Sequence, residues 1–460
     1  MWGNQPSPNG QTEVGATVDD VPVSGFDVKP AALHWYPAVA ARELAATHYL
    51  QALGRLADRP DEALSLSIKA PFCGAHCLCC DRDIRAGQSA AVIDEYVSCL
   101  VKEIKSVAAQ VGIGRDVLQL HLGGGTATEL GDSQLARLVH TLRHVWRLPA
   151  DADMSAECDP RRLGWVQLRL LRGLGFRRLS LGVLDLAPAV QRAIGRFHSA
   201  SLIDDVCALA RECGIECINL ELMIGLPHQS KDTWRETLAH VIAIAPDRVT
   251  LARYRHHPRQ APGQYAIDED ALPDAQACQE LAALAADLLC GAGYRWIGGD
   301  QFVTDTDELA VALDEGRLRR SVMAYCASPA TAVIGLGAGA LSDIDGHVFR
   351  NEADIGSWRR AVQAGTPAVA HAHLTTEQGV RRRRAVEQLL CQLEFPAASA
   401  QGGLEAAYQR LARHDANGLV RELSDRIIVT DAGRHALPML CSELLDRLAG
   451  GVPDGTHWLS

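Results

Sequence analysis

The stretch LSLSIKAPFCGAHCLCC, residues 64–80, places a dense group of cysteines directly after an apolar run. Its first seven residues, LSLSIKA, predict a buried strand. Four cysteines then fall within eight residues, at Cys73, Cys77, Cys79 and Cys80. The loop after this strand is therefore the first candidate for a chemical function, and the segments that follow decide which fold presents it.

Three of the cysteines have a spacing typical of an iron–sulfur site. Cys73, Cys77 and Cys80 form C-x3-C-x2-C immediately after the strand. Three thiolates on one loop can hold three irons of a [4Fe–4S] cluster and leave the fourth iron open to a non-protein ligand. A zinc site, which His76 could complete, and a redox pair of Cys77 and Cys80 are the other interpretations. Cys79 falls between two ligand positions and is not expected to bind metal.

Length and composition describe a globular chain. Its 460 residues suggest two or three domains, and 47% hydrophobic and 22% charged residues allow a substantial core. A formal net charge of −11 argues against nucleic acid or an anionic membrane as partner, and the chain lacks an apolar run of about 18 residues for a membrane span. Residues 1–30 do not resemble a secretory signal and are expected to be a disordered tail. Fourteen cysteines without an export signal favour a cytoplasmic protein.

Strand-like and helical patterns alternate from residue 64 to about residue 292. Six strands are expected, at residues 64–70, 117–122, 154–158, 177–183, 216–224 and 248–254. Repeated strand–helix units imply a parallel sheet with helices outside, and six units are too few for a closed eightfold barrel. The expected fold is therefore α/β, an incomplete (β/α)6 barrel, and ligands should gather at the carboxyl ends of its strands.

The pattern changes near residue 366. Helix, helix, short hairpin and helix follow one another there, which is a winged-helix-like order. Because no basic recognition face is evident, a lid or packing domain is preferred to DNA binding. The predicted domains are a tail at 1–30, a lead-in segment at 31–63, a partial barrel with its extension at 64–365 and a mostly helical domain at 366–460.

Further motifs extend along nearly the whole chain. They are HWYP (34–37), APFC, QLHLGGGTAT, ECDPRR, RLSLGVLD, VQRAIGR, IGLP, PDRVTLARYRHHP, YRWIGGDQF, DELAVALDEG and VTDAGR. On these motifs the chain resembles the oxygen-independent coproporphyrinogen III oxidases, a family of radical S-adenosylmethionine (SAM) enzymes. The resemblance implies a radical SAM barrel that holds a [4Fe–4S] cluster on Cys73, Cys77 and Cys80 and binds one or two SAM molecules. SAM would chelate the open iron, and an electron from the cluster would cleave it to methionine and a 5′-deoxyadenosyl radical.

A glycine-rich turn, GGGTAT, follows the second expected strand. Gly124, Gly125 and Thr126 match the family turn whose backbone lies close to the methionine amine of SAM, an approach that only residues without a side chain allow. Without the resemblance, three glycines after a strand are typical of a tight turn. A second glycine motif, IGLGAG at 334–339, resembles a family loop near a second SAM.

Two carboxylates and one arginine match family residues that orient SAM. Glu157 matches the carboxylate that accepts from the SAM ammonium, although a helix cap before DPRR is the alternative. Arg196 matches the arginine that pairs with the SAM carboxylate, for which an always charged, bidentate guanidinium is well suited. Glu221 stands where the family has an aspartate that binds the ribose hydroxyls.

The implied substrate is coproporphyrinogen III, a tetrapyrrole with four carboxylates, and an acidic protein needs a local basic pocket to bind it. RYRHHPR follows the sixth strand and includes Arg253 and Arg255. Tyr254 and His256 match a family Tyr-x-His-x-Pro that lines the active site. These four residues are the expected substrate contacts, with a solvated basic loop as the alternative.

Several positions depart from the family pattern. They are Ser67 for a tyrosine, Lys69 for a histidine, Cys79 for an aromatic residue, Arg82 for a cysteine, Ala127 for a proline, Leu184 for a ribose-binding glutamine, and MAYC (323–326) for QGYT. Loss of an aromatic face or a ribose hydrogen bond each weakens binding by about 1 kcal/mol. A lowered SAM affinity is therefore expected.

The resemblance implies a cytoplasmic oxidoreductase of haem biosynthesis. It would remove hydrogen from the β-carbon of two propionates, with loss of carbon dioxide and an electron each time, and yield protoporphyrinogen IX. A flavodoxin or ferredoxin would supply the low-potential electron, and a monomer is expected. The altered positions leave two other hypotheses, a non-catalytic haem-binding chaperone or regulatory relative and a related radical SAM methyltransferase.

Overall fold

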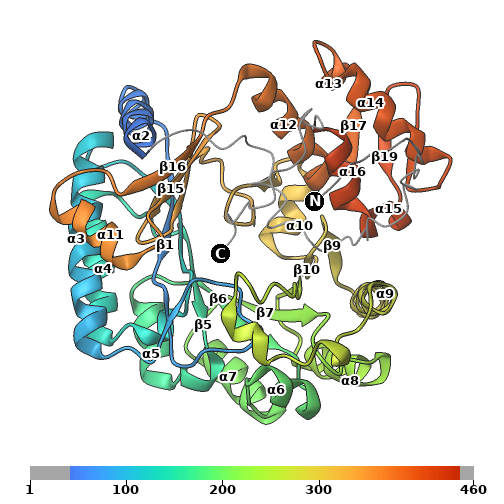
Figure 1. Ribbon diagram of the computed structural model, residues 1–460, viewed down its shortest axis with the longest axis horizontal. Coiled ribbons are helices and arrows are strands. Elements are labelled where there is room, and N and C mark those ends of the chain that lie inside the picture. The colour runs from blue at the N-terminus through green and yellow to red at the C-terminus, as the bar shows by residue number, and fades with distance from the viewer. Residues whose placement is uncertain (1–41, 446–460) are drawn as a thin grey trace, which may run out of the picture.

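The computed structural model describes residues 42–445 (Figure 1). A twelve-stranded sheet organises most of them, in the strand order β16-β15-β14-β13-β1-β4-β5-β6-β7-β8-β10-β9. The expected tail at 1–30, the first part of the lead-in segment with its HWYP motif, and the last fifteen residues at 446–460 lie outside the described residues.

All six predicted strands are present, and they lie side by side in chain order. They are β1 (Leu64–Lys69), β4 (Val117–Gly123), β5 (Asp153–Cys158), β6 (Arg178–Leu184), β7 (Cys217–Ile224) and β8 (Arg248–Arg253). Each pairs in parallel with the next. Parallel strands are covered on both faces, which is why their sequences are rich in Val, Ile and Leu. The fold class is the predicted incomplete α/β barrel, with a sheet that stays open in the described part of the chain.

Helices connect these strands and lie around the outside of the curved sheet (Figure 1). They are α3 (Ala90–Val111), α4 (Asp132–Val145), α5 (Trp165–Gly173), α6 (Pro188–Ile194), α7 (Ala200–Glu212), α8 (Lys231–Ile244) and α9 (Ala275–Gly291). Four of them begin after a residue whose side chain accepts from a free N–H of the first turn, at Ser89, Ser199, Ser230 and Asp274. Helix α4 buries Leu135, Leu138, Val139 and Leu142, a stripe at helical spacing.

A seventh parallel strand and three antiparallel strands extend the sheet beyond β1. They are β13 (Ala332–Leu336), β14 (Leu341–Ile344), β15 (His347–Asn351) and β16 (Val369–His373). The sequence patterns did not predict them, and IGLGAG was expected to be a loop. Position 335 in β13 requires a glycine, because a side chain there would lie 2.3 Å from the carbonyl oxygen of Leu341. The glycine thus lets the two strands approach closely, and it also hides the strand pattern.

The opposite end of the sheet is a short hairpin, β9 (Arg295–Ile297) and β10 (Gln301–Val303), with β10 antiparallel to β8. The remaining elements before the C-terminal part are α2 (Arg42–Ala57), β2 (Phe72–Cys73), β3 (Arg85–Ala86), α10 (Glu308–Asp314), β11 (Arg319–Arg320), β12 (Tyr325–Cys326) and α11 (Ile355–Gln363). Among residues 42–445, no helix combines the length and the apolar composition needed to cross a bilayer.

The C-terminal part has a hydrophobic core of its own, which begins at Ala385. Its elements are α12 (Glu377–Gln392), β17 (Glu394–Pro396), α13 (Ala397–Ala400), α14 (Glu405–Ala412), β18 (Val420–Glu422), β19 (Arg426–Val429), α15 (Asp431–His435) and α16 (Leu437–Glu443). Its helices lie around a three-stranded sheet in the order β17-β19-β18. Strand β16 belongs to the main sheet, however, so the architecture changes after His373 and not at residue 366.

A buried carboxylate joins the extension to the barrel. Glu103 of α3 accepts hydrogen bonds from the backbone N–H of Gly337 at 2.7 Å, Asn351 Nδ2 at 2.8 Å and Trp358 Nε1 at 3.2 Å. Burial raises the pKa of Glu103 to about 7, and the three donors oppose that rise. One side chain therefore links α3 to the end of β13, to β15 and to α11.

We expect Glu103→Gln to lower the free energy of unfolding by about 1–3 kcal/mol, because an amide replaces one acceptor oxygen by a donor that then faces another donor. Urea unfolding of purified variants measures the change. Glu95→Gln on the same helix is the matched control: Glu95 pairs with Arg359 at 2.7 Å on the surface, and its replacement should cost less than about 1 kcal/mol. Equal losses from the two variants would contradict the role of Glu103.

Candidate functional site

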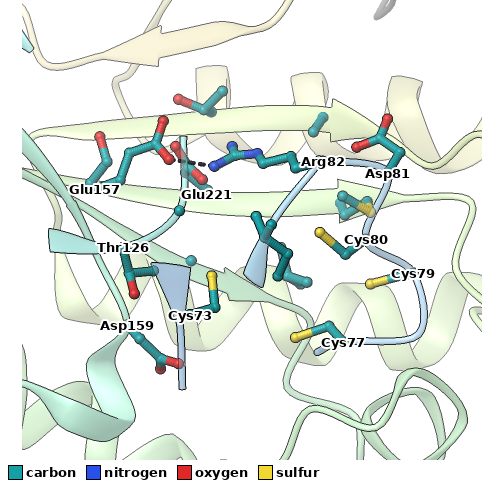
Figure 2. A pocket seen from close by; sticks show the side chains of 18 of the residues that line it. Cys73, Cys77, Cys79, Cys80, Asp81, Arg82, Thr126, Glu157, Asp159 and Glu221 are labelled. Atoms are coloured by element: carbon teal, nitrogen blue, oxygen red, sulfur yellow. Dashed lines mark hydrogen bonds and ion pairs between the residues drawn. The ribbon is translucent and has the colours of Figure 1, made fainter. Parts of the chain in front are cut away.

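A cavity of about 400 Å³ opens at the carboxyl ends of the parallel strands (Figure 2). Most of the predicted site residues line it: Cys73, Cys77, Cys80, Gly125, Thr126, Glu157, Arg196, Glu221, Arg253 and Arg255. Side chains from β1, β5, β6, β7, β8, β14 and β15 and from the cysteine loop thus converge on one space. Gly124 lines a smaller neighbouring cavity of about 190 Å³ instead.

The cysteine loop is held by backbone hydrogen bonds from several segments. The N–H of Cys80 donates to the carbonyl of Cys77 at 3.0 Å, and the N–H of Leu78 donates to the carbonyl of Ile194 at 2.9 Å. The amide of Gln264, which is fully buried, donates to the carbonyl of Cys79 at 3.4 Å. Figure 2 shows the sulfur atoms of Cys77, Cys79 and Cys80 turned toward the same space as that of Cys73.

The donor set suits a group that contains several metal atoms. In the described part of the chain, no three His, Cys, Asp or Glu side chains surround a single ion position, so a four-ligand zinc site finds no support. The thiols of a [4Fe–4S] cluster each bind a different iron and need not meet at one point. Burial raises the pKa of Cys73 to about 12 and also raises that of Cys80, so metal binding must release protons from these thiols.

The glycine-rich turn after β4 supports the cysteine loop directly. A side chain on Gly125 would lie 2.3 Å from the carbonyl oxygen of Phe72, and the N–H of Thr126 donates to that oxygen at 2.8 Å. Gly124 has a φ of +86°, and a side chain there would meet the Lys69 chain at 2.3 Å. Protein atoms therefore fill the space that a side chain on either glycine would occupy. The main structural role of the turn is to position the backbone next to Cys73.

Arg196 is held in place by protein contacts on both sides. It is 8% exposed, and one of its terminal nitrogens, Nη2, donates to the carbonyl of Gly182 and lies 3.5 Å from Asp159 Oδ1. Its other terminal nitrogen, Nη1, lies 3.4 Å from Cys77 Sγ. Its Nε has no hydrogen-bond partner among residues 42–445. Asp159, which also binds Arg161, thus orients Arg196, and the sequence suggested no role for it beyond the helix-cap motif.

The carboxylate of Glu157 lies on β5 with both oxygens engaged. His121 Nε2 lies 3.3 Å from Oε1, and Arg82 Nη1 forms an ion pair with Oε2. His121 is itself held by Ser155 Oγ, 2.9 Å from Nδ1. Glu221 on β7 lines the cavity beside this pair (Figure 2). The two predicted carboxylates are therefore neighbours, and one of them, Glu157, already forms an ion pair with Arg82.

Basic side chains form another part of the cavity wall. Arg253 and Arg255 are joined there by Lys69 from β1 and Arg350 from β15. Burial lowers the pKa of Lys69 to about 8. The sequence did not suggest Arg350, because β15 was not predicted and nothing local distinguishes this arginine. Tertiary pairing of the strands alone brings it to the site.

Tyr254 and His256 do not line the cavity, contrary to their expected role as substrate contacts. The Tyr254 hydroxyl lies 2.8 Å from His256 Nδ1, and His256 Nε2 lies 3.1 Å from Glu269 Oε1. The Tyr254 ring packs in a small apolar cluster with Cys77 and Cys79. Tyr254 therefore packs beside the cysteine loop, while its neighbours Arg253 and Arg255 line the cavity.

One further acidic residue emerges from the structure. Asp300, in the β9–β10 turn, lines the cavity, is 4% exposed and has an Oδ1 without a hydrogen-bond partner in the described residues. A buried carboxylate oxygen in this state is costly unless a ligand supplies a donor. Asp300 lies in the motif YRWIGGDQF, which supported the family resemblance but indicated no function for this residue.

Several of the positions that depart from the family pattern line one or both of the two cavities, whereas Ala127 lines neither. Cys79, Arg82, Leu184 and Lys69 line the larger one, and Ser67, Met323 and again Lys69 line the smaller one. Leu184 has a φ of +67° where the pairing of β6 with β7 shifts register. This left-handed conformation is uncommon for a residue with a side chain, and it turns Leu184 into the cavity wall.

Comparison with known proteins agrees with this geometry. Residues 67–241 match the Radical SAM superfamily. The oxygen-independent coproporphyrinogen III oxidase of Pseudomonas aeruginosa is 34% identical over 395 residues, which cover 84% of this chain and 85% of that protein. The enzyme of the same name from Escherichia coli is 33% identical over 401 residues, 85% of this chain and 87% of that protein. A solved structure of the Escherichia coli coproporphyrinogen III oxidase, described as a radical SAM enzyme, matches with a TM-score of 0.83 and 30% identity over 91% of this chain and 99% of that one.

The open parallel sheet, with three cysteines on the loop after its first strand, defines a radical SAM protein. Within that superfamily, the chain belongs to the oxygen-independent coproporphyrinogen III oxidase family. Membership agrees with the two cofactors expected from the sequence, a [4Fe–4S] cluster and SAM. Cys73, Cys77 and Cys80 would hold the cluster. Arg196 Nε and Asp300 Oδ1, which have no hydrogen-bond partner within residues 42–445, are polar atoms that a bound ligand could satisfy.

We expect Cys79→Ser to retain nearly the iron content of the unmodified protein after anaerobic reconstitution. Cys80→Ser, the adjacent substitution, should lose most of it, as should Cys73→Ser and Cys77→Ser, since three thiolates bind three irons. Iron and sulfide analysis with the visible absorption of the cluster measures the difference. A loss in Cys79→Ser as large as that in Cys80→Ser would show that the ligand set has been misassigned.

Proposed function

We propose that the protein is an oxygen-independent coproporphyrinogen III oxidase of the cytoplasm, which converts two propionates to vinyl groups and yields protoporphyrinogen IX for haem biosynthesis. One observation supports this most directly: thiols, carboxylates and several basic side chains line a single cavity at the carboxyl ends of the strands. The named relatives match over most of this chain and of their own length. The free state of all fourteen cysteines suits a reducing compartment.

The residues around the cysteine loop would bind and orient SAM. Arg196, pinned by Gly182 and Asp159, presents a fixed guanidinium for the carboxylate of SAM. Glu157 and Glu221 offer acceptors for its ammonium and its ribose hydroxyls. When bound, the cluster and SAM together supply the radical that takes a hydrogen atom from each propionate. The protein's own part is to position these groups and to exclude water from them.

The basic part of the wall would hold the tetrapyrrole. Arg253, Arg255, Lys69 and Arg350 are placed to bind propionate carboxylates in a chain whose net charge is −11. Asp300 would accept from pyrrole N–H groups, since its Oδ1 is buried and without a partner in the described residues. The basic residues would bind the propionates at the rim of the macrocycle, and Asp300 would bind its centre. The two reacting propionates would then lie, one after the other, near the part of the cavity where SAM would bind.

An electron donor needs access to the cluster from outside. Ala75 and His76 of the cysteine loop are exposed. Two neighbouring segments contact this loop through Arg162 and Gly195. These segments contain Trp165 and Phe197, whose exposed fractions are 51% and 58%. We propose that a flavodoxin or ferredoxin docks here, and that the protein acts as a monomer. The names of the relatives favour the oxidase over a haem-binding chaperone or a methyltransferase.

The direct test is anaerobic. The reconstituted protein, reduced and supplied with SAM and coproporphyrinogen III, should form protoporphyrinogen IX and 5′-deoxyadenosine, both measured by mass spectrometry. Omission of SAM is the control and should abolish both products. Formation of 5′-deoxyadenosine without vinyl product would reject the oxidase and retain the radical enzyme, and absence of both with an intact cluster would favour the non-catalytic alternative.

We expect Arg253→Ala to raise the KM for coproporphyrinogen III about tenfold or more, because a charge-assisted hydrogen bond to a carboxylate is lost, with a smaller change in kcat. Arg259→Ala is the matched control, since Arg259 is exposed on the same loop and does not line the cavity. Initial rates at saturating SAM measure both constants. An unchanged KM in Arg253→Ala would remove this residue from the substrate site.

A further inference from the structure

Arg82 occupies a position that neither the fold nor the proposed reaction accounts for. It lies two residues beyond Cys80, lines the cavity, and extends across it to the opposite wall, where its Nη1 donates to Glu157 Oε2 (Figure 2). Glu221 lines the same cavity, and an arginine side chain stays protonated in proteins. The guanidinium is therefore charged and is attracted to Glu157 and Glu221.

This contact engages the group on which SAM would depend. Glu157 is the expected acceptor for the SAM ammonium, and His121 Nε2 at 3.3 Å already lies on its other oxygen. An incoming ammonium therefore meets a carboxylate with a cation on Oε2, and the two like charges would repel one another at contact distance. The ammonium can take its place only if Arg82 moves away.

The Arg82 side chain has the freedom to do so. It is 42% exposed, whereas the Glu157 side chain is 16% exposed, so the arginine lies nearer to solvent and the carboxylate deeper in the wall. An exposed guanidinium can leave an ion pair without disturbing the fold, because water solvates the charge once it is released. The carboxylate stays in place for the incoming ligand.

We infer that Arg82 sets the SAM affinity of this protein by competing with the ammonium of SAM for Glu157. The inference rests on the proposed function only in that SAM binds in this cavity. SAM contains two cationic groups and one carboxylate. Removal of Arg82 would take one positive charge away from Glu157 and Glu221 and would favour a ligand of net positive charge.

The test compares SAM dissociation constants of the cluster-reconstituted protein, measured anaerobically by equilibrium dialysis. Arg82→Ala should bind SAM about tenfold more tightly, since one charge-assisted contact no longer has to be broken. Arg82→Lys keeps a cation and should remain within about threefold of the unmodified protein, a change well below one such contact. Arg85→Ala is the matched control, because Arg85 lies three residues further on, is exposed, pairs with Asp83 at 3.6 Å and does not line the cavity.

A second ligand separates charge competition from a gain of space. 5′-Methylthioadenosine has the adenosine part of SAM but neither cation, so Arg82→Ala should change its affinity less than about twofold, far below the effect of a lost charged contact. Equal tightening toward both ligands would overturn the inference, because extra room would then be the cause. Weaker or unchanged SAM binding in Arg82→Ala would also overturn it and assign Arg82 to ligand binding or to structure.

The outcome is distinguishable from failure of the proposed function. Tighter SAM binding by Arg82→Ala, with no vinyl product from either protein, would support the competition and reject the oxidase. Oxidase activity in the unmodified protein, with no gain of SAM affinity in Arg82→Ala, would reject the competition alone. Absence of SAM binding in every variant would reject both.

Discussion

The close contact between the glycine-rich turn after β4 and the cysteine loop after β1 is the constraint on which the site depends. Gly125 packs against the backbone of Phe72 so tightly that a single added carbon would lie 2.3 Å from its carbonyl oxygen. Backbone cannot move aside as a flexible side chain can, so Cys73 is placed by the path of two parallel strands. The other thiols follow from that anchor through the hydrogen bonds that close the loop.

Charge in the cavity is arranged by parts of the chain that are far apart in sequence. Glu157 and Glu221 come from β5 and β7, whereas Lys69, Arg253 and Arg350 come from β1, the end of β8 and β15. An overall net charge of −11 is therefore compatible with a site for a polycarboxylate, because the cations are gathered where the strands end. The ion pair of Arg82 with Glu157 crosses this arrangement and joins the cysteine loop to the SAM side.

Local motifs identified part of the site and misplaced another part. Glu157 and Glu221 reach the cavity because they lie on β5 and β7, and Arg196 reaches it from the turn after α6. Tyr254 was expected there too, but it packs with Cys77 and Cys79 in a small apolar cluster and does not line the cavity. Asp159, Asp300 and Arg350 could not be found from the sequence, because spacing along the chain does not encode tertiary contacts. Asp159 contacts Arg196, and Asp300 has an oxygen without a partner among the described residues. Arg350 reaches the cavity through strand pairing.

The sequence by itself determined the six central parallel strands, their order and the loop with the cysteines. Strands buried on both faces require continuous apolar runs, and helices between them require apolar residues at helical spacing, so both patterns are local. Only the tertiary structure decided that β13 to β16 extend the sheet beyond β1 and that Arg350 joins the cavity. The same holds for Arg82 and Glu157, which are 75 residues apart. Strand pairing at a glycine-rich edge and ion pairs across a cavity depend on distances in space. Local sequence patterns do not encode those distances.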